Sequence, residues 1–159
     1  MQKIPITTKG IQALRQELER LKTKERPLIT KAISEARGHG DLKENAEYHA
    51  AKENQGLLEA RIRDLEYNLA NANVIDIAKL PQSGIVVFGT TVTVVNLNDD
   101  TASTYQLVGD EEANVEQGKI SINSPIARAL VGKKIGDTAT ATIPSGVLEF
   151  EITKIEYIA

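Results

Sequence analysis

Residues 11–21 read IQALRQELERL, and residues 58–72 read LEARIRDLEYNLANA. In both stretches apolar or small residues recur at alternating intervals of three and four, which is typical of a coiled-coil seam. The two seams mirror each other, because the numbers of facing residues sum to 83 in every pair: Ile11 with Ala72, Leu14 with Leu69, Leu18 with Leu65, and Leu21 with Ile62. An antiparallel helical hairpin requires such a constant sum, and this sum puts the fold-back between positions 41 and 42.

The same pairing continues toward the fold-back with fewer apolar side chains. It matches Glu25 with Leu58, Leu28 with Gln55, Ala32 with Ala51, and Glu35 with Tyr48. Pro27 interrupts the first helix, and since a proline removes a backbone hydrogen bond we expect a bend there, with the seam resuming at Leu28. The glycines of Gly38-His39-Gly40 predict the end of this helix.

The second half of the chain has the period of two that is typical of strands. Apolar or small residues alternate with polar ones over residues 91–94, 139–143 and 148–153. A change of phase before Ile155 predicts a β-bulge. Pro144-Ser145-Gly146 predicts the turn of a β-hairpin.

The sequence therefore predicts an α+β fold in two parts. We expect a long antiparallel coiled-coil hairpin over residues 1–76, a linker over 77–83, and a compact antiparallel β domain over 84–159. Ser124 as an N-cap with Pro125 in the first turn predicts one short helix in the β domain. A chain of 159 residues is long enough for two small domains.

Composition narrows the class of protein further. The chain is 41% hydrophobic but has no Trp and no Cys, so we expect an aliphatic core without disulfides or thiolate metal sites. No apolar run is long enough for a signal peptide or a membrane span, which predicts a soluble, cytoplasmic protein. The net charge of −3 argues against tight autonomous binding of nucleic acid. The charge is +2 over residues 1–75 and −5 over residues 76–159, so the two halves are expected to meet different surfaces.

The stretch at the fold-back, GDLKENAEY over residues 40–48, allows two interpretations. Asp41 as N-cap with Glu44 three residues later fits a capping box, and both residues would then only start the second helix. From the pattern alone this is the commoner case. The other interpretation is that two neighbouring carboxylates at the end of a long arm share a hard cation such as Mg²⁺. Two carboxylates do not complete an octahedral site, so a partner or a substrate phosphate would supply the other ligands.

Three basic residues, Arg37, Lys43 and Lys52, flank the acidic pair. They are candidates for contact with RNA phosphates. Basic residues on a helix surface of mixed charge are more often simply solvated.

Other polar residues suggest less chemistry. His39 and His49 have no partner at metal-ligand spacing, so we expect both to be exposed. Ser124 has no evident base partner and fits an N-cap better than a nucleophile. The pair Glu111-Glu112 is expected to be a solvated loop charge.

Residues 40–51, GDLKENAEYHAA, closely resemble the hairpin tip of the Gre family of bacterial transcript-cleavage (elongation) factors, in its GreA type. The resemblance covers essentially the whole chain and includes RP at 26–27, NVID at 73–76, FGTTVTV at 88–94 and ISINSPIAR at 120–128. The tip motif is far longer than a bare capping box. It therefore favours a functional role for Asp41 and Glu44.

The resemblance implies an elongation factor that is not itself an enzyme. An FKBP-like C-terminal domain would dock at the rim of the secondary channel of bacterial RNA polymerase through the stretch Ser124, Pro125 and Ile126. The hairpin of the monomeric factor would enter that channel and reach a backtracked RNA 3′ end. The factor would bind no cofactor alone, and Asp41 and Glu44 would help hold Mg²⁺ and its attacking water in the polymerase active site. The polymerase would then hydrolyse the RNA and rescue the arrested complex.

The resemblance also places Arg37 and Lys52 where the family has basic residues that contact the emerging RNA, although Lys lacks the planar fork of Arg. Three other functions stay open at this point. One is an inhibitor of the same superfamily that enters the same channel and blocks it. The others are a coiled-coil adaptor, in which Asp41 and Glu44 only cap a helix, and an autonomous nuclease, which the scarcity of metal ligands disfavours.

Overall fold

The computed structural model describes residues 3–41 and 44–158 of the chain and divides them into two compact units. One unit is Ile11–Asn71, and the other combines residues 3–10 with residues 72–158. The sequence-based division at 1–76, 77–83 and 84–159 differs from this one, because the N-terminal residues join the C-terminal unit. Within the described ranges, none of the helices combines the length and the apolar composition that a membrane crossing requires.

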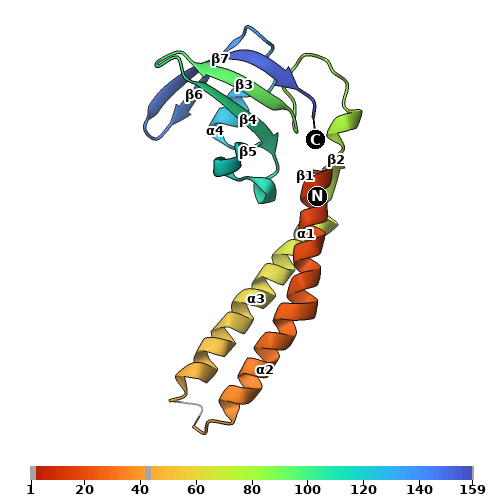
Figure 1. Ribbon diagram of the computed structural model, residues 1–159, viewed down its shortest axis with the longest axis vertical. Helices are drawn as coiled ribbons and strands as arrows, with labels where there is room; N and C mark the ends of the chain where they lie inside the picture. The colour runs from red at the N-terminus through yellow and green to blue at the C-terminus, as the bar shows by residue number, and fades with distance from the viewer. Residues whose placement is uncertain (1–2, 42–43, 159) are drawn as a thin grey trace. The chain divides into compact units, whose positions relative to one another are not determined.

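The first unit is a helical hairpin, as expected (Figure 1). Helix α1 (Thr8–Arg20) runs into a π-helical turn (Leu21–Glu25) and then into α2 (Arg26–Arg37), and α3 (Ala46–Ala70) returns beside them. The buried apolar side chains are Ile11, Leu14, Leu21, Ile33 and Ala36 on the outgoing helices and Ala51, Leu58, Ile62 and Leu65 on α3. The seam predicted for the returning helix is therefore confirmed from Ala51 to Leu65, whereas Ala72, which was expected to belong to it, lies beyond the end of α3.

The seam predicted for the outgoing helix is correct up to Leu21 and wrong beyond it. Leu28, which was expected in the seam, is 60% exposed, whereas Ile33 and Ala36 are buried. The reason is the π-helical turn, in which the N–H of Arg26 donates to the carbonyl of Leu21, five residues back. Such a turn absorbs one extra residue and shifts the buried face by one position. The turn ends two residues before Pro27, which has no N–H to continue an α-helical ladder.

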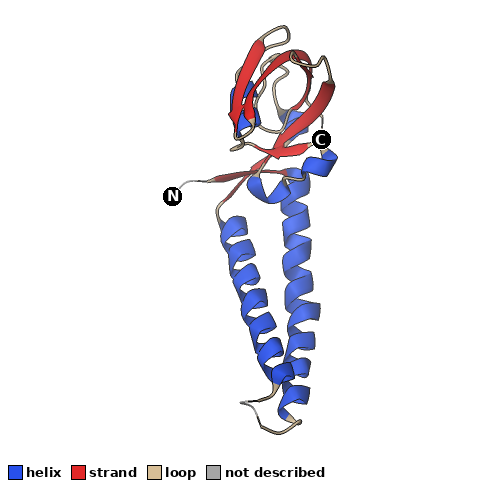
Figure 2. Cartoon of the chain, turned by 90° about the vertical axis from the view of Figure 1, so that its left-hand side faces the viewer, coloured by secondary structure: helices blue, strands red, loops and turns tan. Residues whose placement is uncertain are grey.

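The second unit contains a curled sheet (Figure 2). Its five strands have the order β5-β4-β3-β7-β6. Its strands are β3 (Thr91–Asn96), β4 (Ala102–Val108), β5 (Lys119–Ser121), β6 (Thr138–Ile143) and β7 (Gly146–Glu156). Three pairings are antiparallel, but β4 and β5 are parallel. The expectation of an antiparallel domain is thus corrected to a mixed sheet, because the connection of ten residues from β4 to β5 brings the chain back in the same direction.

Two local predictions for the sheet are confirmed. Strands β6 and β7 form a hairpin whose last paired residues are Ile143 and Gly146. The pairing of β3 with β7 shifts register after Thr93, where Thr153 is the extra residue of a bulge. The Thr153 hydroxyl donates to the carbonyl of Thr93 at 3.1 Å, which ties the bulge to its neighbouring strand.

The core of the second unit lies between the sheet and helix α4 (Pro125–Leu130). Side chains from alternate strand positions point into it, as a period of two requires. Its buried members are Val86, Val92, Val94, Leu107, Ile120, Ala127, Leu130, Ala139, Ala141, Phe150 and Ile152. The core is aliphatic except for Phe150, as the composition predicted.

A short strand pair was not expected from the sequence. Strand β1 (Ile4–Thr7) pairs in parallel with β2 (Ala72–Ile75), which follows the hairpin. The four-residue strands leave little periodic signal, and their pairing joins segments that are distant in sequence. This pairing explains why the N-terminal residues join the C-terminal unit.

The first turn of α1 is capped by a carboxylate from far along the chain. The Thr7 hydroxyl accepts from the Gly10 N–H at 3.1 Å, and the Thr7 N–H donates to the Glu112 carboxylate at 3.1 Å. Glu112 also accepts from the Gly109 N–H at 2.9 Å and from the Thr7 hydroxyl. Glu112 therefore takes the role that the third helical residue has in a capping box. Its assignment as a solvated loop charge was wrong.

Gly10 leaves room for this carboxylate, since a Cβ there would lie 2.2 Å from Glu112 Oε1. We expect Glu112→Ala to lower the free energy of unfolding by about 1–2 kcal/mol, the usual cost of a lost cap. Gly10→Ala should also destabilise the wild-type protein, because the carboxylate must leave Thr7. In the Glu112→Ala background the same Gly10→Ala change should instead stabilise by up to about 1 kcal/mol, through helix propensity. Urea denaturation of the four proteins checks this change of sign, and equal effects in both backgrounds would contradict it.

The π-helical turn gives a second prediction. In a Pro27→Ala background, which removes the proline ring from the helix, deletion of Lys24 should leave Ile33 and Ala36 on the buried face. Deletion of Ser34, which lies between Ile33 and Ala36, should in the same background turn one of these two side chains off the buried face by about 100°, because no change of the turn realigns both, and should cost roughly 1–3 kcal/mol of burial. Thermal unfolding followed by circular dichroism distinguishes the two deletions. A Lys24 deletion that destabilises as much as the Ser34 deletion would refute the proposed role of the turn.

Candidate functional site at the tip of the hairpin

The outgoing helix ends where the glycines predicted. Helix α2 stops at Arg37, and the N–H groups of Gly38 and His39 donate to the carbonyls of Glu35 and Ala36, each at 3.1 Å. Gly40 has a φ of 109°, a conformation that strongly favours glycine. The chain then passes through Asp41 and Glu44 before the returning helix begins, while Lys43 lies outside the described residues.

The N-cap of the returning helix is Asn45, four residues later than expected. Its side-chain oxygen accepts from the Tyr48 N–H at 3.0 Å. The capping box predicted from Asp41 and Glu44 is therefore wrong. Asn caps helices as well as Asp does, so the sequence offered both starts, and only the structure distinguishes them.

Three side-chain contacts link the two helices at the tip. The Asn45 side-chain nitrogen donates to the Ala36 carbonyl at 2.5 Å. His39 Nδ1 lies 2.8 Å from Glu47 Oε2, and the Arg37 guanidinium lies 5.8 Å from the centre of the Tyr48 ring. His39 and His49 are both exposed, as expected, and His49 makes an edge contact with Tyr48. Arg37 is thus placed at the tip by a cation–π contact.

Asp41 and Glu44 lie in the loop between the helices, and both are exposed. Glu44 immediately precedes the N-cap, where the partial positive charge of the α3 N-terminus favours a carboxylate. Their oxygens are ligands of the kind that Mg²⁺ prefers. Among the described residues, no group of three or more His, Asp or Glu side chains is placed to hold a metal ion. The tip therefore offers donors that fit part of a magnesium site.

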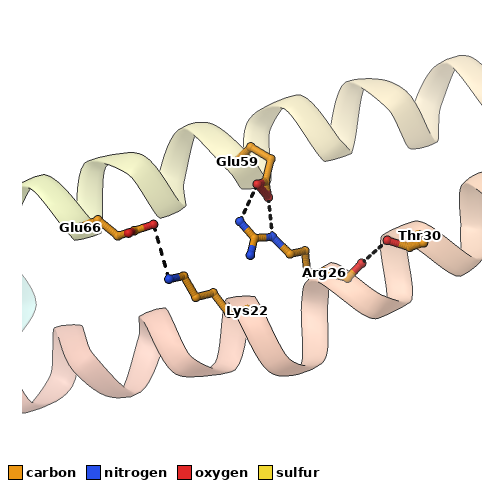
Figure 3. Close-up of polar contacts among 5 residues, drawn as sticks. All are labelled: Lys22, Arg26, Thr30, Glu59 and Glu66. Carbon is orange, nitrogen blue, oxygen red and sulfur yellow. Dashed lines mark hydrogen bonds and ion pairs between the residues drawn. The ribbon is translucent and has the colours of Figure 1, made fainter.

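Ion pairs hold the two helices of the arm together below the tip (Figure 3). The Arg26 guanidinium binds the Glu59 carboxylate through two hydrogen bonds of 3.0 and 2.6 Å, and Lys22 lies 3.6 Å from Glu66. Arg61 makes a similar two-bond contact with Glu17, at 3.0 Å for each bond. These pairs join residues across the hairpin and confirm its antiparallel pairing.

The Arg26–Glu59 pair changes the pKa of both groups. The hydrogen bonds from Arg26 lower the pKa of Glu59. Desolvation of the Glu59 carboxylate opposes this shift, and the positive charge of Arg26 adds to it. The same hydrogen bonds raise the pKa of Arg26. Both side chains are largely solvated, so the pair aligns two rigid elements rather than anchoring a core.

The other residues singled out by the sequence lie on α3 and at the start of α4. Lys52 is exposed on α3 and donates to Gln55 at 3.0 Å. Ser124 is the N-cap of α4, as predicted, and its hydroxyl accepts from the Ala127 N–H at 3.3 Å. Pro125 is exposed, and Ile126 packs against the core of the second unit.

Comparison with known proteins identifies the family. Residues 4–74 match the family model described as Transcription elongation factor, N-terminal, and residues 81–157 match that described as Transcription elongation factor, GreA/GreB, C-term. The chain is 59% identical over 157 residues to Transcription elongation factor GreA of Nitrosococcus oceani, covering 99% of both proteins. The chain belongs to the GreA/GreB family. This Gre-family chain is also 56% identical to Transcription elongation factor GreA of Haemophilus influenzae, over 99% of the chain and 100% of that protein.

The Gre-family chain also resembles a solved structure, the crystal structure of GreA factor homolog 1 (Gfh1) protein of Thermus thermophilus. The identity is 30% and the TM-score 0.44, over 98% of this chain and 99% of that one. The two family models and the full-length relatives confirm the predicted family, and the chain is a transcription elongation factor. Since RNA polymerase carries out elongation, this factor acts with that enzyme.

Sequence reasoning missed one residue of the Gre-family tip. Asn45 caps one helix and contacts the other, but it was treated only as part of a motif. The sequence did indicate Asn45 as an N-cap, because Asn is a favoured N-cap residue and no glycine or proline follows it until Gly56. The contact with Ala36 could not be anticipated, because it depends on how closely the helices approach.

Because of the Arg26–Glu59 pair, we expect the folding stability of this Gre-family factor to depend on pH. A carboxylate with a lowered pKa stabilises the folded state above its ordinary pKa and loses that contribution as the pH falls through its lowered value. Glu59→Gln should therefore reduce the melting temperature at pH 7, and the difference from wild type should vanish in acid below that lowered pKa. Glu53→Gln on the same helix is the matched control. A Glu59→Gln difference that is constant from pH 7 to strong acid would show that the pair does not stabilise the hairpin.

Proposed function

We propose that this factor inserts its hairpin into the secondary channel of RNA polymerase and stimulates the polymerase's own hydrolysis of backtracked RNA. The observation that carries the proposal is the position of Asp41 and Glu44. Both are exposed, lie between the helix ends, and are not the caps of either helix. A hairpin that ends in two carboxylates suits delivery of these groups into a narrow cleft.

The two carboxylates have a defined part in this mechanism. Asp41 and Glu44 would hold Mg²⁺ of the polymerase active site together with ligands from the polymerase and the RNA phosphate. When bound, Mg²⁺ supplies Lewis-acid stabilisation of the charge that develops at the scissile phosphate. The carboxylates also accept hydrogen bonds, by which they would orient water toward the phosphorus. The RNA would keep a new 3′ end in register, and the factor itself would be unchanged and not an enzyme.

Basic residues and the second unit would hold the factor and the RNA in place. Arg37 and Lys52 would contact phosphates of the extruded RNA. Ser124, Pro125 and Ile126 would dock on the polymerase at the rim of the channel. The exposed ring of Pro125 and the capped start of α4 support this assignment. We further propose that the hairpin is a coiled coil and that the sheet with α4 is FKBP-like.

The factor would act as a monomer in the cytoplasm, where bacterial polymerase works. Inhibition of elongation by channel blocking is the second candidate function. The names of the full-length relatives do not favour it, since these are elongation factors of the GreA type. A purified protein that slows elongation without shortening RNA would revive it.

The test uses RNA polymerase stalled in a backtracked state with labelled RNA. Wild-type protein and Mg²⁺ should shorten the RNA, and the variant Asp41→Asn, Glu44→Gln should lose this stimulation by roughly a hundredfold or more, because it lacks charged ligands. Glu53→Gln is the control, since it removes one exposed carboxylate farther along α3. RNA length is followed on denaturing gels, and polymerase binding by competition with labelled wild-type factor.

Each outcome decides between functions. Loss of cleavage in a variant that still binds supports the proposal. Equal shortening by both proteins would mean that the tip carboxylates are dispensable. Binding without shortening by wild type would point to an inhibitor or an adaptor, and shortening of RNA without polymerase would show a nuclease.

A further inference from the structure

One side chain at the tip is bonded to both helices of the hairpin. The Asn45 oxygen accepts from the Tyr48 N–H at 3.0 Å, and its nitrogen donates to the Ala36 carbonyl at 2.5 Å. The first bond satisfies a free N–H at the start of α3. The second adds a side-chain donor to the Ala36 carbonyl at the end of α2, which also accepts from the His39 N–H at 3.1 Å. A carbonyl oxygen has two lone pairs and can accept both bonds.

The chemistry of the two partners explains why the residue is an amide. A backbone N–H can only donate and a carbonyl can only accept, so the side chain between them must accept at one atom and donate at the other. The amide of Asn has both functions at fixed geometry, whereas an ionised Asp has only acceptors. The same partners fix the orientation of the amide group.

The position of Asn45 makes this pair of hydrogen bonds important. Asn45 directly follows Glu44 and lies four residues after Asp41, while Ala36 is 3% exposed at the end of the buried seam. Among the contacts of the described tip residues, that of His39 with Glu47 joins side chains that are 59% and 70% exposed. Exposed pairs of this kind contribute little. The Asn45 contact is partly buried and is the stronger restraint on the ends of the loop.

We propose that Asn45 is a positioning residue. By joining the end of α2 to the start of α3, it fixes where Asp41 and Glu44 lie, so that both carboxylates can bind the magnesium ion and meet the RNA. This inference rests on the proposed function. Asn45 touches neither the metal nor the substrate, and it acts through the two carboxylates. Asp41 and Glu44 lie close along the chain to helix ends that Asn45 ties together, so each has fewer conformations and less ordering is needed when the ligands meet.

The discriminating variant is Asn45→Ser, because Ser is an equally good N-cap but has no amide to donate to Ala36. Asn54→Ser, at an exposed position of the same helix, is the matched control. Each protein is tested for polymerase binding, for the cleavage rate at saturating factor, and for the Mg²⁺ concentration that gives half the maximal rate. Backbone ¹⁵N relaxation of the free protein measures the order parameters of Asp41 and Glu44 without any polymerase.

We expect Asn45→Ser to bind polymerase and to keep the helicity of wild type. Its cleavage rate should fall roughly ten- to a hundredfold, with a higher half-saturating Mg²⁺ concentration. The order parameters of Asp41 and Glu44 should fall from the range of rigid backbone, about 0.85, toward the flexible range below about 0.6. Asn54→Ser should match wild type throughout.

Two results would overturn the inference. Unchanged order parameters in Asn45→Ser would show that the amide does not restrain the loop. Lowered order parameters with undiminished cleavage would show that the restraint has no part in the reaction. If wild type cleaves nothing, the proposed function fails and the role of Asn45 in it fails as well. The relaxation data would still report separately whether Asn45 orders the loop.

Discussion

The hairpin depends on keeping one apolar face of each helix continuous from its base toward its tip. Leu58, Ile62 and Leu65 form this face on α3 without interruption. The outgoing helix meets Pro27 midway, and a π-helical turn absorbs one residue so that Ile33 and Ala36 still face inward. Toward the tip the buried side chains shrink to alanine, which buries little surface. Near the tip the two helices are therefore joined mainly by polar contacts, such as that of Asn45 with the Ala36 carbonyl.

Sequence periodicity predicted the elements that depend on neighbours along the chain. It indicated the hairpin and a bulge before Ile155, while local motifs indicated the β6–β7 turn and the N-cap at Ser124. It failed at the π-helical turn before Pro27, because a fixed repeat of three and four residues cannot predict where a helix takes up one extra residue. It also could not find the β1–β2 pair or the role of Glu112, since both depend on segments that are far apart in sequence. The acidic pair was found by resemblance and pattern together, but its supporting residue Asn45 was missed.

The tip separates two tasks that the sequence alone assigns to the same residues. Asn45 is the N-cap of α3 and also donates a hydrogen bond to the end of α2, so Asp41 and Glu44 are not needed to begin a helix. Their charge is therefore not required at the N-cap of α3. Changing them should disturb chemistry more than folding, whereas changing Asn45 affects the shape of the loop. This division makes the function and the architecture of the tip separately measurable.

The pairing of β1 with β2 and the contact of Thr7 with Glu112 have a consequence for biosynthesis. A ribosome synthesises a chain from its N-terminus, so residues 3–10 emerge before the segments that pair with them. The hairpin has all of its residues once residue 71 has been synthesised. The unit that contains residues 3–10 is therefore completed after the hairpin. Until then the first turn of α1 has the Thr7 hydroxyl as its cap but lacks the Glu112 carboxylate, and a chain truncated before Glu112 never gains that contact.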